Sequence, residues 1–128
     1  MKSLLSSLSP ALHDGVFVFT SVHPTTDLHG LDVVATMRED EGLSLVLPEA
    51  EARSRGFPIL FRAAWITLCV ASDLQAVGLT AAVANALAAA GIACNVIAGV
   101  HHDHVFVPFA QAAAALSTLR ELQASGGG

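Results

Sequence analysis

The second half of the sequence alternates between strand-like and helix-like segments in an order that few folds accommodate. We expect strands at 60–70, 92–99 and 104–108, and helices at 79–91 and 110–124. The strands are apolar, β-branched and aromatic, whereas the segment 79–91 is rich in alanine and is closed by Gly91. This order is the ferredoxin-like pattern βαββαβ without its last strand.

The first half indicates a degenerate copy of the same pattern, without its first strand. We expect a short helix at 4–9, strands at 15–22, 32–38 and 43–48, a turn at 24–30 and a helix at 48–56. A hairpin joins 32–38 to 43–48, with Gly42 available for a positive φ. Its acidic residues Glu39, Asp40 and Glu41 are expected to form a solvated tip.

Together the halves predict an α+β fold, a ferredoxin-like antiparallel sheet with helices on one face. The strand at 60–70 is central in its unit and needs a pairing partner that the first half can supply. We therefore expect two degenerate βαββαβ-like units that share one sheet, 1–60 and 61–124, followed by a flexible tail at 125–128.

The composition limits the classes of partner. The chain is 53% hydrophobic and 13% charged, with a mean hydropathy of +0.60, which favours apolar surface buried against a partner. A net charge of −5 with six Lys and Arg residues argues against nucleic acid and against an anionic membrane surface. The uncharged run from Leu74 to Val100 is long enough to span a bilayer, but it is rich in alanine and lacks flanking cations, so we do not expect a membrane span. With a poor signal peptide at its start, the sequence predicts a cytoplasmic protein.

Three stretches carry a resemblance to a known family. "MREDEGLSLVLP" (37–48), "SDLQAVGLTAA" (72–82) and "NVIAGVHHDHVFVP" (95–108) are similar to small stand-alone tandem ACT-like proteins, most of them uncharacterised. The longer stretch 72–99 resembles the core of an ACT domain. This resemblance implies self-association and a small ligand, usually an amino acid, bound where two units meet at the loop before the first helix.

The resemblance places a ligand site around the start of the helix at 79–91. The residues expected there are Asp73, Val77, Gly78, Leu79, Thr80 and Asn95. Backbone N–H groups at 78–80 would bind a carboxylate, Asp73 would accept from an ammonium group, and Asn95 could do either. The alternative is structural: Ser72 and Gln75 form a capping box, and Asn95 is a satisfied buried side chain.

The stretch "HHDH" at 101–104 admits a metal site or only a polar turn. His102 and His104 would share a strand face, with Asp103 on the other, and His101, His13, His23 or His29 would have to complete the ligand set. Nothing in the spacing requires this, so we expect no metal and no cofactor. The absence of a placed nucleophile argues against an enzyme.

Strand alternation separates Ile66, Leu68 and Val70 from Trp65, Thr67 and Cys69. If helices cover the first set, Trp65 and Phe106 lie on the face that the helices leave bare, and a second copy of the chain would cover them. The sequence thus predicts a non-catalytic regulatory module that binds an amino acid and forms a homodimer or a higher homo-oligomer. The alternatives are an interaction module that acts through the sheet face and, less favoured, a metal-binding protein.

Cys69 and Cys94 match no disulfide framework or zinc spacing. In ferredoxin-like strand order they would lie two strand spacings apart, about 10 Å, beyond the roughly 7 Å that a disulfide allows. We expect two free, buried thiols that react with a thiol reagent only after unfolding.

Overall fold

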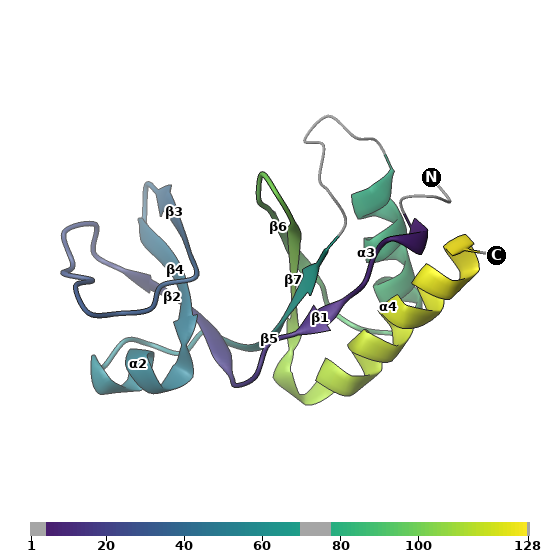
Figure 1. Cartoon of the computed structure of the whole chain (residues 1–128). Helices are drawn as coiled ribbons and strands as arrows, with labels where there is room; N and C mark the ends of the chain where they lie inside the picture. Colours follow the sequence, from purple (N-terminus) through teal and green to yellow (C-terminus); the bar gives the residue numbers. More distant parts are fainter. Residues whose placement is uncertain (1–4, 70–77, 128) are drawn as a thin grey trace. The chain divides into compact units, whose positions relative to one another are not determined.

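The computed structural model describes residues 5–69 and 78–127 (Figure 1). The chain forms two compact units. One, which we call the inserted unit, is Gly15–Ala63; the other, the terminal unit, combines Met1–Asp14 with Ala64–Gly128. These units differ in extent from the expected repeats 1–60 and 61–124, because the first fourteen residues belong with the second half. Those repeat boundaries stay a prediction.

The inserted unit has the ferredoxin-like strand order. Its elements are β2 (Phe17–Val22), β3 (Ala35–Glu39), β4 (Gly42–Pro48), α2 (Glu49–Ser54) and the start of β5 (Phe61–Leu68). The strands pair in the order β3-β4-β2-β5, and the pairings of β2 with β4 and β5 and of β3 with β4 are antiparallel. The segment 23–34, between β2 and β3, contains no helix. The expectation that this half lacks its first strand is therefore wrong, since β2 is that strand and the first helix is what is missing.

The hairpin of β3 and β4 forms as the sequence predicts. Gly42 has a φ of 156°, and a Cβ on it would lie 2.8 Å from the carbonyl oxygen of Val22. Glycine is required here by this close approach as well as by its φ. Glu39, Asp40 and Glu41 are exposed, as expected of a solvated tip.

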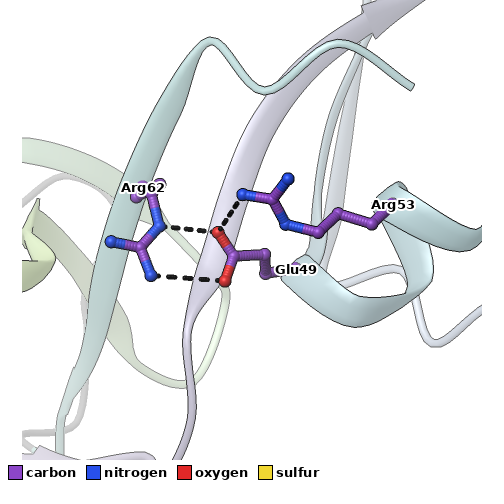
Figure 2. A network of polar contacts seen from close by, with 3 residues as sticks. All are labelled: Glu49, Arg53 and Arg62. Carbon is purple, nitrogen blue, oxygen red and sulfur yellow. Dashed lines mark hydrogen bonds and ion pairs between the residues drawn. The ribbon is translucent and has the colours of Figure 1, made fainter. Parts of the chain in front are cut away.

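A polar network fixes α2 to β5 within the inserted unit (Figure 2). Glu49 accepts from Arg62 Nε at 2.6 Å and from Arg53, one helical turn along α2, at 3.2 Å. The hydrogen bond from Arg62, assisted by that from Arg53, lowers the pKa of the Glu49 carboxyl. The ion pair therefore holds α2 to the strand at neutral pH.

The terminal unit carries the second copy of the pattern. It contains the rest of β5, α3 (Leu79–Ala89), β6 (Asn95–Ala98), β7 (Asp103–Pro108), a 3-10 turn at Phe109–Gln111 and α4 (Ala112–Gly127). β7 lies between β5 and β6 in the pairing order. The missing fourth strand is supplied by β1 (Ala11–Leu12), which pairs antiparallel with β5 at Thr67 and Ile66. Strand β5 thus serves both units, as the last strand of one and the first of the other.

Helices α3 and α4 cover one face of the strands in the terminal unit (Figure 1). Ile66 and Leu68 of β5 and Val105 and Val107 of β7 point into the core between strands and helices. The helices contribute Leu79, Val83, Leu87, Ala115 and Leu119. Among the residues that the structure describes, no helix is long and apolar enough to cross a membrane.

Helix α4 is longer than expected. It continues through Ser125 and Gly126 to Gly127, into the segment expected to be a flexible tail. Gly126 is buried where the helix passes closely over Leu5, and a Cβ there would collide with that side chain. Gln123 adds two hydrogen bonds to this contact, accepting from the Ser9 amide and donating to the Ser6 carbonyl. Packing against the N-terminal segment therefore extends the helix despite its glycines.

The cysteines are free, as expected, but they are not both buried. Strand β5 ends at Leu68, so Cys69 lies beyond it and is exposed, with its amide donating to the carbonyl of Leu8. Cys94 is half-buried, and burial raises the pKa of its thiol. The expectation that both thiols are buried is therefore wrong for Cys69.

We expect one thiol per native chain to react rapidly with a thiol reagent and the other clearly more slowly, because Cys94 is shielded and its thiolate is scarcer. Stopped-flow absorbance with the reagent in excess measures both phases. Cys69→Ser should abolish the fast phase and Cys94→Ser should retain it. Two thiols that react only in denaturant would contradict this assignment.

The inserted unit holds a buried hydroxyl without a partner. Thr20, in β2, is 3% exposed, and its Oγ1 has no hydrogen-bond partner among the described residues. Thr20→Val removes this unsatisfied group while keeping the shape, so we expect the free energy of unfolding to rise by about 1 kcal/mol in urea denaturation. Thr36→Val, at an exposed position in β3, is the matched control and should change it by less than about 0.5 kcal/mol. A lower stability for Thr20→Val would show that the hydroxyl is satisfied.

Candidate functional site

The expected ligand site is centred on the start of α3. The structure places Gly78 at the N-cap with φ 97°, Leu79 as the first helical residue, buried at 5% exposure, and Thr80 exposed beside it. The first intrahelical bond is donated by Ala82 to Gly78, so the earlier N–H groups have no acceptor within the helix itself. That Gly78 precedes a helix opened by Leu79 is confirmed. Asp73 and Val77, and the alternative capping pair Ser72 and Gln75, lie outside the described residues.

Asn95 is not beside this helix start in the terminal unit. It opens β6, the strand that follows the C-terminal end of α3, and the 11 residues of that helix span about 16 Å. The alternative of a buried, satisfied Asn95 is wrong, because the side chain is exposed. Its register partner is Phe106, so Asn95 lies on the sheet face away from the helices. The helix start and Asn95 can meet in one site only if a second chain brings them together.

The "HHDH" stretch covers the end of the turn between β6 and β7, at His101 and His102, and the first two residues of β7, Asp103 and His104. The amide of Gly99 donates to the carbonyl of His102 at 2.9 Å, and a Cβ on Gly99 would lie 2.9 Å from that oxygen. Asp103 is buried, whereas His101 and His102 are exposed. In the part of the chain that the structure describes, no group of three His, Cys, Asp or Glu residues could hold a metal ion. The geometry therefore favours a polar turn.

The structure instead brings His104 together with three residues of the N-terminal segment and β5. We call His13, Trp65, Thr67 and His104 the Trp65 cluster. The imidazole of His13 stacks on the indole of Trp65, with ring centroids 3.5 Å apart and planes within 5°. The amide of His13 donates to the carbonyl of Trp65 at 2.9 Å, which places the ring directly over the indole.

Polar bonds close the cluster. Trp65 Nε1 donates to His104 Nδ1 at 3.0 Å, Thr67 Oγ1 lies 3.1 Å from the same nitrogen, and His13 Nε2 lies 2.7 Å from Thr67 Oγ1. All four side chains are half-buried. Trp65, Thr67 and His104 belong to the sheet face expected to be bare. Within a single chain they are instead hydrogen-bonded to one another and to His13.

The sheet face differs from its sequence-based expectation. Phe106 is fully buried, and it stacks under Trp65 with centroids 6.1 Å apart. The expectation that both aromatics lie bare and need a second copy is therefore wrong, because His13 covers Trp65 from above. Sequence reasoning named His13 only as a possible metal ligand and missed its stacking on Trp65, because β1, the strand before it, has only two residues and no strand pattern. The one available signal was a histidine between Pro10 and the turn residues Asp14 and Gly15.

Both imidazoles of the cluster have lowered pKa values. Burial is the larger cause for His13, followed by the charge of His104, and Asp14 opposes them. Burial likewise leads for His104, followed by His102, and Asp103 opposes. The environment thus favours two neutral rings.

These shifts predict a pH dependence of stability. In the folded chain both histidines have pKa values below the usual 6.5, so on acidification the unfolded chain binds protons first. The stability that the neutral rings contribute is therefore complete above pH 6.5 and is lost as the pH falls from there through the folded-state pKa values. We expect the free energy of unfolding in urea to decrease from pH 8 to pH 5. The double variant His13→Asn with His104→Asn should flatten this dependence, and His29→Asn, exposed in the inserted unit, should not. A wild-type stability that rises on acidification would contradict the assignment.

Comparisons with known proteins agree with this architecture. A family model described as an ACT domain matches residues 1–64, and a second ACT-domain model matches residues 61–121. No curated protein matches the sequence.

Solved structures extend the comparison. A Vibrio cholerae protein of unknown function, described as a possible transport protein, is 46% identical over 95% of this chain and 94% of its own, with a TM-score of 0.86. The ligand-free regulatory subunit of aspartate kinase from Thermus thermophilus is 13% identical over 91% of this chain and 98% of its own, with a TM-score of 0.65. E. coli aspartokinase III in complex with aspartate and ADP is 14% identical over 88% of this chain and 32% of its own, with a TM-score of 0.65.

The aspartate kinase structures share the fold of this chain, with its two ferredoxin-like units. Both halves of the sequence match ACT models, and the strand order of each unit is that of the ferredoxin-like pattern. The chain belongs to the ACT-domain family.

Proposed function

We propose that this chain is a non-catalytic regulatory ACT protein that binds an amino acid. The observation that carries the proposal is the pair of ACT matches over the two halves, together with the fold shared with an aspartate kinase regulatory subunit of nearly the same extent. A relative that is solved with aspartate supports an amino acid as the ligand class. The proposal includes a cytoplasmic location.

The proposed site lies at the start of α3. The amides of Gly78, Leu79 and Thr80 bind the ligand carboxylate, because a helix N-terminus carries a partial positive charge and the first turn of α3 holds no acidic residue. Asp73 accepts from the ammonium group, and Val77 borders the ligand. All amino acids share an α-carboxylate next to an α-ammonium group, so contacts to the side chain of the ligand must decide which amino acid is bound.

The proposed active form is a homodimer. Asn95 lies at the far end of α3 within its own chain, so a second copy would have to bring it to the ligand. The interaction-module alternative loses its main support, since His13 and Trp65 cover the aromatic face within one chain.

Thermal-shift screening against the standard amino acids at millimolar concentration tests the proposal. We expect at least one to raise Tm, because a ligand at a hundred times its Kd adds about 2.7 kcal/mol to stability. No shift with any of them would contradict amino-acid binding.

Site variants then locate the ligand. Asp73→Asn should weaken the Kd of the selected amino acid about tenfold, which corresponds to about 1.4 kcal/mol. Asp40→Asn, at the exposed hairpin tip, is the matched control and should leave the Kd unchanged. If calorimetry shows that Asn95→Ala binds the amino acid as tightly as wild type, Asn95 is not part of the site. If sedimentation shows a monomer at saturating ligand, the proposed dimer is wrong.

A further inference from the structure

In the Trp65 cluster, the hydrogen bond between Trp65 and His104 forms only when Nδ1 of His104 carries no proton. An indole N–H is a donor and never an acceptor. Trp65 Nε1 lies 3.0 Å from His104 Nδ1, so this nitrogen must carry a lone pair. The proton of the neutral imidazole is then on Nε2, on the side that faces Gly99.

The hydroxyl of Thr67 extends this assignment to His13. It has one proton, and it lies 3.1 Å from His104 Nδ1 and 2.7 Å from His13 Nε2. With the Thr67 O–H directed at His104 Nδ1, whose single lone pair it shares with the Trp65 N–H, Thr67 Oγ1 accepts from His13 Nε2–H. This arrangement gives every polar contact of the cluster one donor and one acceptor.

The two histidines respond differently to a second proton. When His13 becomes a cation, its Nε2–H still donates to Thr67, and its ring still lies 3.5 Å from the indole, where a cation–π interaction is favourable. When His104 becomes a cation, a proton on Nδ1 opposes the N–H of Trp65 and the O–H of Thr67. Burial disfavours a charge on either ring, but only the protonation of His104 breaks hydrogen bonds of the cluster.

We propose that His104 is a proton-sensitive latch that holds Trp65 and, through it, the N-terminal strand β1 in the sheet of the terminal unit. His13 directly follows β1 and is bound to Trp65 by both its ring and its amide. A change in the position of the indole therefore acts on β1. The latch does not depend on the proposed amino-acid site, because it uses none of its residues.

Among the residues that the structure describes, the titratable groups on the segments around His104 are His13 and Asp14 after β1, His101 and His102 in the turn before β7, and Asp103 in β7 itself. Strand β5 contributes Trp65 and Thr67, and β6 contributes Ile97, none of which titrates in this range. Burial and His102 lower the pKa of His104 while Asp103 raises it, so the latch is closed at neutral pH and opens on acidification.

NMR of the full chain tests the latch directly, because Trp65 is its single tryptophan. We expect the indole N–H signal to be that of a hydrogen-bonded group at pH 8 and to lose this character by pH 5, with the same midpoint as the ring of His104. At pH 8 the His104 ring should carry its proton on Nε2. An indole signal that does not change between pH 8 and pH 5, or an Nδ1–H ring at pH 8, would overturn the proposal.

Matched variants assign the response to one histidine. In His104→Asn the amide oxygen takes the place of Nδ1 as an acceptor without titrating, so the indole should stay hydrogen-bonded from pH 8 to pH 5. In His13→Asn the pH response should persist. A response that persists in His104→Asn and disappears in His13→Asn would make His13 the sensor and overturn the proposal. The wild-type ring measurement decides the matter if either variant fails to fold.

Discussion

The backbone of β5 takes part in two sets of hydrogen bonds that complete two separate units. The first residues of β5 pair with β2, and there β5 is the fourth strand of the inserted unit. Its later residues pair with β1, and there β5 is the first strand of the terminal unit and β1 stands in for the fourth. In each ferredoxin-like unit the fourth strand therefore comes from outside the repeat as read along the sequence. This strand is β5 in the inserted unit and β1, from the start of the chain, in the terminal unit. This explains how 128 residues contain two such units although each repeat along the sequence is incomplete.

Local sequence signals predicted the regular elements well where turn and cap chemistry mark their ends. Gly42 set the β3–β4 hairpin, Gly78 and Leu79 set the start of α3, and Pro48 set the start of α2. These residues act through their own backbone conformation, so a single sequence suffices to interpret them.

The parts that the sequence could not predict depend on contacts between distant residues. Strand β1 has two residues and no strand pattern of its own, and it exists because β5 offers it hydrogen bonds. Phe106 is fully buried and stacks with Trp65, which His13 covers in turn, and α4 continues through Gly126 where it packs closely on Leu5. The ligand residues Asp73 and Val77, given by the family resemblance, stay a prediction.

Placement of the N-terminal segment is the central structural claim, since it completes the terminal unit and positions His13. Residue-resolved hydrogen exchange at pH 8 measures it directly, because the amide of His13 donates to the Trp65 carbonyl and the amide of Cys69 donates to the Leu8 carbonyl. We expect both amides to be protected to a degree comparable with those of β5. Exchange of the His13 and Cys69 amides at the rate of an unstructured peptide, with β5 itself protected, would contradict the claim.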